Sequence, residues 1–139
     1  MTDENVGTEF HEGEDVKDLA VLKDRLIAKL GNKEYEVLWA IMIKPDGTLK
    51  SIEHLATGDA KEVGMPQEEI FKRVKAAGVK EFALLHNHPG VDGAATPSIQ
   101  DMRMTLATIV LAHYEGLQLV DHLIVNRSKV GSIRQQKYL

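Results

Sequence analysis

Three short apolar runs, separated by segments with helical spacing, most constrain how this 139-residue chain can fold. The runs, each bounded by glycine, proline or polar residues, cover positions 35–43, 81–85 and 117–125. Apolar stretches of this length between turn signals are typical of buried strands. Apolar residues at helical spacing, each set ending near a glycine, cover positions 16–30, 66–77 and 97–114. Interspersed strands and helices predict an α+β fold, with a mixed β-sheet flanked by helices.

Two further segments extend the predicted sheet. Pro45-Asp46-Gly47 is a strong turn signal, so residues 48–56 are expected to return antiparallel to the first strand. Residues 131–133 are a candidate for a last short strand. The sheet is thus expected to be mixed, with a hairpin at one end.

The acidic charge is concentrated at the N-terminus. Residues 1–18 hold seven acids and one base, whereas the rest of the chain holds 14 acids and 16 bases. Residues 1–15 have little apolar surface to bury, so we expect a flexible acidic lead before a single domain over 16–139. The net charge of −4 argues against a general affinity for nucleic acid.

The absence of cysteine excludes several classes of site. A disulfide, a thiolate zinc site and a cysteine nucleophile are ruled out, so a metal would need His, Asp, Glu or backbone oxygen ligands. No apolar stretch reaches the roughly 20 residues that span a bilayer. The acidic N-terminus does not resemble a signal peptide. We therefore expect a soluble, cytoplasmic protein.

The strongest chemical signal lies at the end of the second apolar run. It reads His86-Asn87-His88-Pro89, and Ser98 and Asp101 follow after a glycine-containing loop. Residues two apart in a strand point to the same face, so His86 and His88 project together. Asp101, in the first turn of the next helix, can supply a third ligand. Two histidines and one carboxylate leave a fourth tetrahedral position for water, as in catalytic zinc sites.

A hydrolytic zinc site also needs a base and support for the oxyanion. Glu36 heads the first apolar run, where a carboxylate is costly unless it has a partner or a task. It is our candidate for the base that takes a proton from the activated water, and Ser98 is our candidate donor to the oxyanion. Both have simpler interpretations. Ser98-x-x-Asp101 is also a helix capping box, and Glu36 can be an exposed residue at a strand start.

The remaining histidines are expected to have structural roles. His11, His54 and His113 are predicted near the surface, away from the motif. Asp121 and His122 are neighbours in a strand, so their side chains point to opposite faces. Either can support the site from outside the ligand shell, and a buried hydrogen-bonding role is favoured.

In this order, the residues resemble the JAMM (MPN-type) metalloprotease motif, a glutamate upstream of His-x-His and Ser-x-x-Asp. More narrowly, the chain is similar to the RadC family over about residues 17–134, on the segments 83–89, 96–101 and 119–125. The resemblance implies a JAB/MPN-type fold related to the cytidine-deaminase architecture. It also implies one Zn2+ per chain, bound by His86, His88 and Asp101, with Glu36 as general base and Ser98 as oxyanion support.

The function implied by the resemblance is that of a zinc-dependent metallopeptidase or isopeptidase. Its substrate would be a protein or peptide, for example the C-terminus of a ubiquitin-like protein. Two alternatives stay open: an inactive or metal-free JAB interaction module, and a RadC-like protein with a role associated with DNA repair. RadC-like proteins usually carry a helix-hairpin-helix region ahead of this domain, and the single helix predicted here argues against DNA binding. The loop between His88 and Ser98 has nine residues, two more than the family leads us to expect, which can change substrate access.

Overall fold

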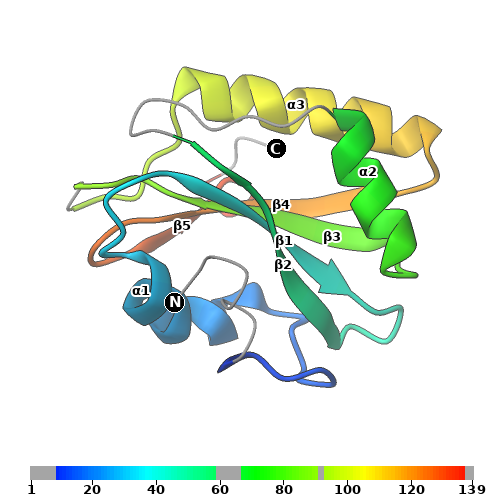
Figure 1. Ribbon diagram of the computed structural model, residues 1–139, viewed down its shortest axis with the longest axis horizontal. Coiled ribbons are helices and arrows are strands. Elements are labelled where there is room, and N and C mark those ends of the chain that lie inside the picture. The colour runs from blue at the N-terminus through cyan, green and yellow to red at the C-terminus, as the bar shows by residue number, and fades with distance from the viewer. Residues whose placement is uncertain (1–8, 59–66, 91–92, 137–139) are drawn as a thin grey trace.

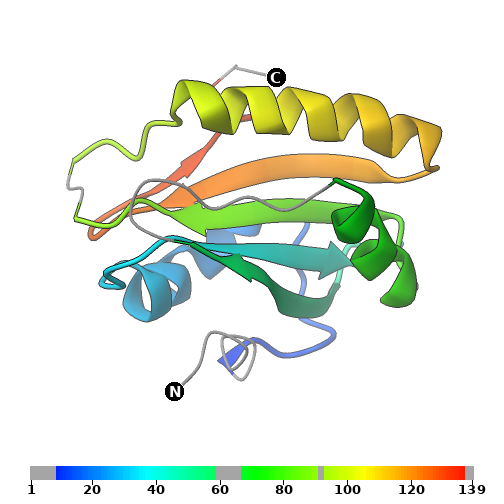
Figure 2. The ribbon, with the colours of Figure 1, turned by 45° about the horizontal axis from the view of Figure 1, so that its top comes forward.

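The computed structural model describes residues 9–58, 67–90 and 93–136 (Figure 1). Five strands form one sheet in the order β2-β1-β3-β4-β5. Their bounds are Val37–Ile43 for β1, Leu49–Thr57 for β2, Glu81–Asn87 for β3, Gln118–Val125 for β4 and Val130–Ser132 for β5. Helices α2 (Gln67–Ala76) and α3 (Ile99–Tyr114) cover one face, and α1 (Lys23–Leu30) lies on the other (Figures 1 and 2). This mixed sheet between helices confirms the predicted α+β fold.

Strand pairing brings three chain segments together at one edge. β1 is antiparallel to both β2 and β3, whereas β3 and β4 are parallel neighbours joined through α3. Leu38 pairs with His86, and His86 pairs with Ile124. The carboxyl ends of β3 and β4 therefore lie beside the start of β1. Because α3 follows β3, its first turn lies at this same edge (Figure 2).

The sheet separates two apolar layers. Alternate residues of β1 divide between them: Val37, Trp39, Ile41 and Ile43 face α1, whereas Leu38, Ala40 and Met42 face α2 and α3. All seven residues of β1 are buried. A strand covered on both faces is apolar throughout, which explains the continuous run that predicts it.

The first helix is shorter than the apolar spacing predicts. Instead of one helix over 16–30, the chain forms the 3-10 helix η2 (Leu19–Leu22) and then α1. The Val16 backbone N–H donates to Gly47, and the Asp18 side chain accepts from the Ala20 backbone N–H. These bonds hold the chain in a turn before η2, so helical geometry begins later. The end at Leu30, followed by Gly31, is as predicted.

The described part of the acidic lead packs against the domain. Phe10 is buried, and the Arg25 guanidinium lies 5.2 Å from the centre of its ring. The Gly13 N–H donates to the Leu49 carbonyl, and the Leu49 N–H donates to the Glu14 carbonyl. Residues 9–15 thus differ from the free segment that the composition predicts, because one aromatic residue and several paired groups attach them. Residues 1–8 lie outside the described residues.

The ion pair between Glu14 and Arg25 is expected to make part of the stability sensitive to acid. Arg25 donates to both carboxylate oxygens, at 2.9 and 2.6 Å. Hydrogen bonding to this guanidinium lowers the pKa of Glu14 to about 2, from 4.5 for an unperturbed glutamate. A lowered folded-state pKa contributes stability that is fully present above pH 4.5 and is lost as the pH falls toward about 2.

We therefore expect Glu14→Gln to weaken the dependence of the unfolding free energy on pH across this acid window. Urea unfolding at a series of pH values measures it, with Asp24→Asn, at an exposed acid of α1, as the matched control. If wild type and Glu14→Gln lose stability equally as the pH falls, the ion pair does not act as described.

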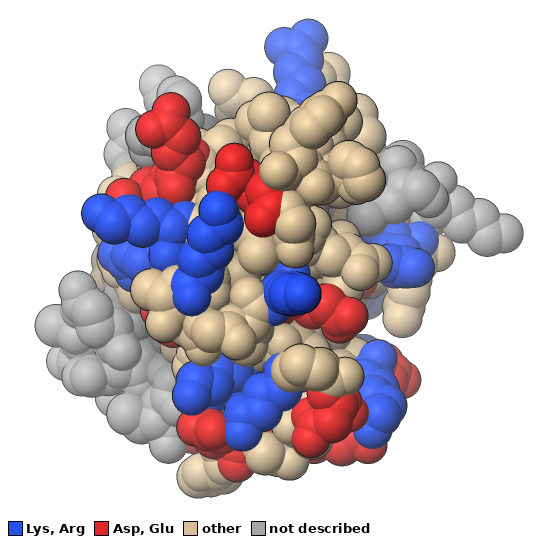
Figure 3. Space-filling model, turned by 90° about the vertical axis from the view of Figure 1, so that its right-hand side faces the viewer, with Lys and Arg blue, Asp and Glu red and all other residues tan. Residues whose placement is uncertain are grey.

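Charged side chains of both signs intermix on the face of the molecule shown in Figure 3. The elements on that side in Figure 1 include α2 and the end of α3, which carry the ion pairs Lys75–Glu115 and Arg73–Glu69. Basic groups there are therefore partly neutralised by acids. Within the described residues, no helix combines the length and apolar character needed to cross a bilayer.

Candidate metal centre

The three predicted ligands converge where β3 ends and α3 begins. His86 Nε2 lies 3.0 Å from His88 Nε2 and 3.0 Å from Asp101 Oδ1. His88 Nε2 lies 3.0 Å from Asp101 Oδ2. The two histidines share one face because they are two residues apart, and the first turn of α3 brings the carboxylate over them. Among the described residues, these side chains form the one cluster of three His, Asp or Glu residues suited to hold a metal.

The spacing of the ligand atoms fits a small tetrahedral ion. Zinc binds histidine nitrogen and carboxylate oxygen at about 2.0–2.1 Å, which places neighbouring ligand atoms about 3.3 Å apart. The separations of 3.0 Å are within a few tenths of an ångström of this value. The two that involve Asp101 join different carboxylate oxygens to the two histidines, so the oxygen that binds the metal would also move toward the second histidine. Unprotonated nitrogen and oxygen atoms this close repel each other unless a proton or a cation lies between them. The donor set therefore fits a zinc ion.

The capping box of α3 orients Asp101. Ser98 is the N-cap residue, and its Oγ accepts from the Asp101 backbone N–H at 3.0 Å. In return, Asp101 Oδ2 accepts from the Ser98 backbone N–H at 2.7 Å. The capping interpretation of Ser98-x-x-Asp101 is confirmed, and it is compatible with metal binding because the cap turns the carboxylate toward both histidines. The role of Ser98 as oxyanion donor stays a prediction.

The electrostatics of the cluster keep Asp101 ionised. Burial raises the pKa of Asp101, but hydrogen bonds with His86, His88 and the Ser98 backbone outweigh it and hold the pKa well below its usual value. The side chains of His86, His88 and Asp101 are 4%, 16% and 13% exposed. Catalytic zinc sites keep one coordination position open to water. A partly exposed cluster with an ionised carboxylate is compatible with that arrangement.

Glu36 lies just before β1, on the same face as the two histidines. Leu38 pairs with His86, so the antiparallel register continued by two residues places Glu36 opposite His88. Side chains two apart in a strand point the same way, so Glu36 and Leu38 share a face. Glu36 is half-buried, and its carbonyl accepts from the Gly58 N–H at 3.0 Å. The continued register therefore predicts that Glu36 lies beside the ligand cluster, and its role as base also stays a prediction.

Asn87 lies between the two histidines and points away from them, as strand alternation predicts. Its Oδ1 accepts from the Val37 backbone N–H at 2.9 Å, and its Nδ2 donates to the Tyr35 carbonyl at 3.0 Å. These two partners are the neighbours of Glu36 on either side. The buried Asn87 amide therefore holds the backbone segment that carries the predicted base.

If the centre hydrolyses peptides, as the sequence resemblance implies, Asn87→Ala should reduce that hydrolysis more than it reduces zinc affinity. The substitution leaves buried backbone groups without partners, at a cost of about 1–3 kcal/mol each. It also removes the hydrogen bonds that hold residues 35 and 37, on either side of Glu36, and it replaces none of the three candidate ligands. Ile52→Val, at a buried position of β2 that pairs with Ile41, is a control with a loss of about 0.5–1.5 kcal/mol. Equal losses of hydrolysis and zinc affinity in Asn87→Ala would count against this role for Asn87.

Thr105 and His122 extend the cluster into the core. His122 Nε2 lies 2.7 Å from His86 Nδ1, and His122 Nδ1 lies 2.6 Å from Thr105 Oγ1. The His122 ring is fully buried, and this burial, with the nearby His86, lowers its pKa well below the usual value. The sequence analysis favours a buried hydrogen-bonding role for His122 but misses Thr105. Its position four residues after Asp101, on the same side of a helix, is the signal that could have found it.

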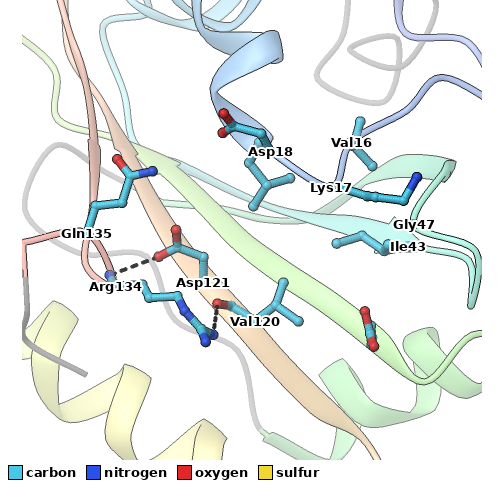
Figure 4. Close-up of a pocket in the computed structure, with 11 residues that line it drawn as sticks. Val16, Lys17, Asp18, Ile43, Gly47, Val120, Asp121, Arg134 and Gln135 are labelled. Atoms are coloured by element: carbon cyan, nitrogen blue, oxygen red, sulfur yellow. Dashed lines mark hydrogen bonds between the residues drawn. The ribbon is translucent and has the colours of Figure 1, made fainter.

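Asp121 points to the opposite face of β4 from His122, as predicted: His122 contacts Thr105 of α3, whereas Asp121 borders a pocket with Val16 and Asp18. Its carboxylate accepts from the backbone N–H of His122 at 2.7 Å, from that of Arg134 at 3.1 Å, and from the Ser132 hydroxyl. Figure 4 shows this pocket and the residues that line it. Asp121 therefore ties β4 to β5 and the residues after it, and does not join the histidine cluster.

The other three histidines lie outside the ligand cluster. His11 and His113 are exposed, as predicted. His54 is half-buried on β2, where its Nε2 lies 2.6 Å from Thr57 Oγ1.

The described ends of the loop between His88 and Ser98 are attached to the β4–β5 hairpin. Asn126 Nδ2 donates to the Gly93 carbonyl at 3.2 Å, and Ala95 is buried against Ile124. A Cβ atom at Gly131 would lie 2.0 Å from the Ala95 carbonyl oxygen, so this approach requires glycine. Residues 91–92 lie outside the described residues, and the effect of the loop on substrate access stays a prediction.

Comparison with known proteins identifies the family. The model of a RadC-like JAB domain matches residues 16–138. A UPF0758 protein of Latilactobacillus sakei is 30% identical over 115 residues, which cover 83% of this chain and 50% of the relative. A UPF0758 protein of Clostridium beijerinckii is 29% identical over 120 residues, covering 86% of this chain and 50% of the relative. The chain spans about half the length of these curated relatives. Since the family match includes Glu36 and all three candidate ligands, the chain that carries this centre belongs to the RadC-like JAB domain family.

Proposed function

We propose that the chain is a zinc-dependent metallopeptidase or isopeptidase. The observation that carries this proposal is the convergence of His86 Nε2, His88 Nε2 and the Asp101 carboxylate at separations of 3.0 Å. Three protein ligands leave the fourth tetrahedral position to water or substrate, which is typical of catalytic rather than structural zinc. The position of Glu36 on the same face adds a base where hydrolysis needs one.

The metal, Glu36 and Ser98 would each have a defined role in hydrolysis. A bound zinc would supply Lewis-acid polarisation of the carbonyl and lower the pKa of a water molecule to about 7. Glu36 would accept a proton from that water and deliver it to the leaving amine. Ser98 Oγ accepts from the Asp101 backbone and keeps its own O–H, which would donate to the carbonyl oxygen as negative charge develops.

The proposed substrates are proteins or peptides, including isopeptide bonds at the C-terminus of a ubiquitin-like protein. Attack on a carbonyl carbon by activated water cleaves either kind of amide. The proposed mechanism requires neither nucleic acid nor a membrane.

The zinc-loaded chain can be tested against a library of fluorogenic peptides and against isopeptide-linked conjugates of ubiquitin-like proteins. We expect cleavage that a zinc chelator abolishes and added zinc restores. A chain that carries about one zinc yet cleaves nothing in either set, or cleavage that survives the chelator, would contradict the proposal.

A further inference from the structure

We infer that Thr105 and His122 are positioning residues that set the tautomer of His86 and keep its Nε2 lone pair available for a metal. The inference rests on the proposed metal site, but it concerns two residues outside the ligand cluster. Thr105 lies on α3, which covers this face of the sheet, and His122 lies on β4, the parallel neighbour of β3. The two side chains therefore approach His86 from different elements. Both side chains are buried.

The hydroxyl of Thr105 determines where the first proton lies. Thr105 Oγ1 is 2.6 Å from the Asp101 carbonyl oxygen and 2.6 Å from His122 Nδ1. Electronegative atoms this close require a proton in each gap. The carbonyl oxygen has none, so the hydroxyl donates to it. The proton in the second gap must then come from His122, which is therefore protonated at Nδ1.

The same assignment of protons extends from His122 to His86. His122 is fully buried, where a charged ring is costly, so a neutral ring protonated at Nδ1 has a bare Nε2. That Nε2 lies 2.7 Å from His86 Nδ1, so the proton between them belongs to His86. When a cation instead of a proton lies within the cluster, His86 is neutral, and protonation at Nδ1 then leaves its lone pair on Nε2. This is the atom that faces His88 and Asp101.

The partner of His86 is unusual for a metal-binding histidine. Such a ring commonly donates its other N–H to a carboxylate, a backbone carbonyl or water, none of which can reverse the bond by changing tautomer. His122 can reverse it, because a neutral imidazole can carry its proton on either nitrogen. The direction of the bond to His86 therefore depends on Thr105.

Loss of the Thr105 hydroxyl would remove that control. His122 could then place its proton on Nε2, facing His86 Nδ1. His86 would in turn hold its proton on Nε2, between itself and Asp101, where it blocks the metal. Zinc binding would then have to move both protons back, and the affinity would fall.

Two substitutions of Thr105 separate the hydroxyl from its shape. Thr105→Val keeps the branched shape without the hydroxyl, and Thr105→Ser keeps the hydroxyl. We expect Thr105→Val to lower zinc affinity by about 10–100-fold, the range found when an outer partner of a metal-binding histidine is lost. Thr105→Ser should stay close to wild type, and His122→Phe should lose at least as much as Thr105→Val. Competition with a chromophoric chelator measures affinity, and urea unfolding of the metal-free proteins shows that each is folded.

Ring-nitrogen NMR of the zinc-loaded wild-type protein locates the protons directly, and it does not depend on whether a variant folds. His122 is expected to be protonated at Nδ1 and bare at Nε2, a signature that a merely structural role would not determine. His122 protonated at Nε2 would overturn the inference. So would Thr105→Val binding zinc as tightly as wild type, or Thr105→Ser losing as much affinity as Thr105→Val.

The outcomes also separate this inference from the proposed function. A wild-type chain that binds no zinc overturns the metal site and the role of Thr105 and His122 together. A chain that binds zinc with the expected tautomers but cleaves no peptide overturns the proposed hydrolysis alone.

Discussion

Replacement of Glu36 by glutamine is expected to abolish most peptide hydrolysis while zinc binding stays unchanged. Glutamine keeps the size and hydrogen-bonding capacity of the side chain but cannot take a proton from water. Loss of a general base typically costs about 10²–10⁴-fold in rate. Because Glu36 is not among the atoms that converge on the proposed metal position, the zinc content should remain about one per chain.

Glu34→Gln is the matched control for Glu36→Gln. Glu34 is an exposed acid in the bend before β1, so this substitution makes the same change in charge two residues away from the proposed base. Initial rates, zinc content and melting temperature are compared for the three proteins, using a peptide found in the library screen. Wild-type rates in Glu36→Gln would exclude Glu36 as the base, and loss of zinc in that variant would show that it acts on the ligands instead.

The second large effect is expected for Asp101→Asn, which should lose zinc affinity by more than about 100-fold. That exceeds the loss typical of an outer partner, because a ligand and its charge are removed together. Asparagine keeps a side-chain oxygen that can accept from the Ser98 N–H, so the cap of α3 should persist. Zinc at about 1,000 times its dissociation constant adds roughly 4 kcal/mol to the stability of wild type. The variant should gain far less at the same zinc concentration.

Ser98→Ala is the control for damage to the helix cap, because it is expected to lower stability while leaving the zinc ligands in place. Loss of an N-cap hydroxyl costs about 1 kcal/mol of stability, but it removes no ligand. We expect Ser98→Ala to be less stable than wild type without zinc and to keep most of its zinc affinity. Asp101→Asn that binds zinc as tightly as wild type would exclude Asp101 as a ligand.

Much of the sheet and the grouping of the three candidate ligands could be predicted because both depend on patterns within a few residues. β1 is apolar throughout since both of its faces are covered, and the turn at 45–47 brings back β2 as its antiparallel partner. The alternation of side chains in β3 is enough to put His86 and His88 on one face and Asn87 on the other. Asp101 follows from the helix start marked by Ser98.

The contacts that were missed join residues far apart in the chain. Thr105 lies 17 residues before its partner His122, in a helical segment whose apolar neighbours indicate only a buried face. Glu14 lies 11 residues before Arg25, and the composition of residues 1–15 does not reveal that this pair forms. The late start of α1 has the same origin, because Val16 is held by Gly47 on another turn. Local spacing can place Thr105 on the side of α3 that carries Asp101, but it does not identify partners that lie on other elements.

The measurement that tests the central claim most directly is anomalous diffraction at the zinc absorption edge, on crystals of the chain grown with zinc. The account predicts one peak per chain, about 2.0–2.1 Å from His86 Nε2, His88 Nε2 and an oxygen of Asp101. It also predicts the Glu36 carboxylate on the side of the fourth, water-accessible position. The absence of a peak at these three side chains, or a fourth protein side chain that closes the coordination, would contradict it.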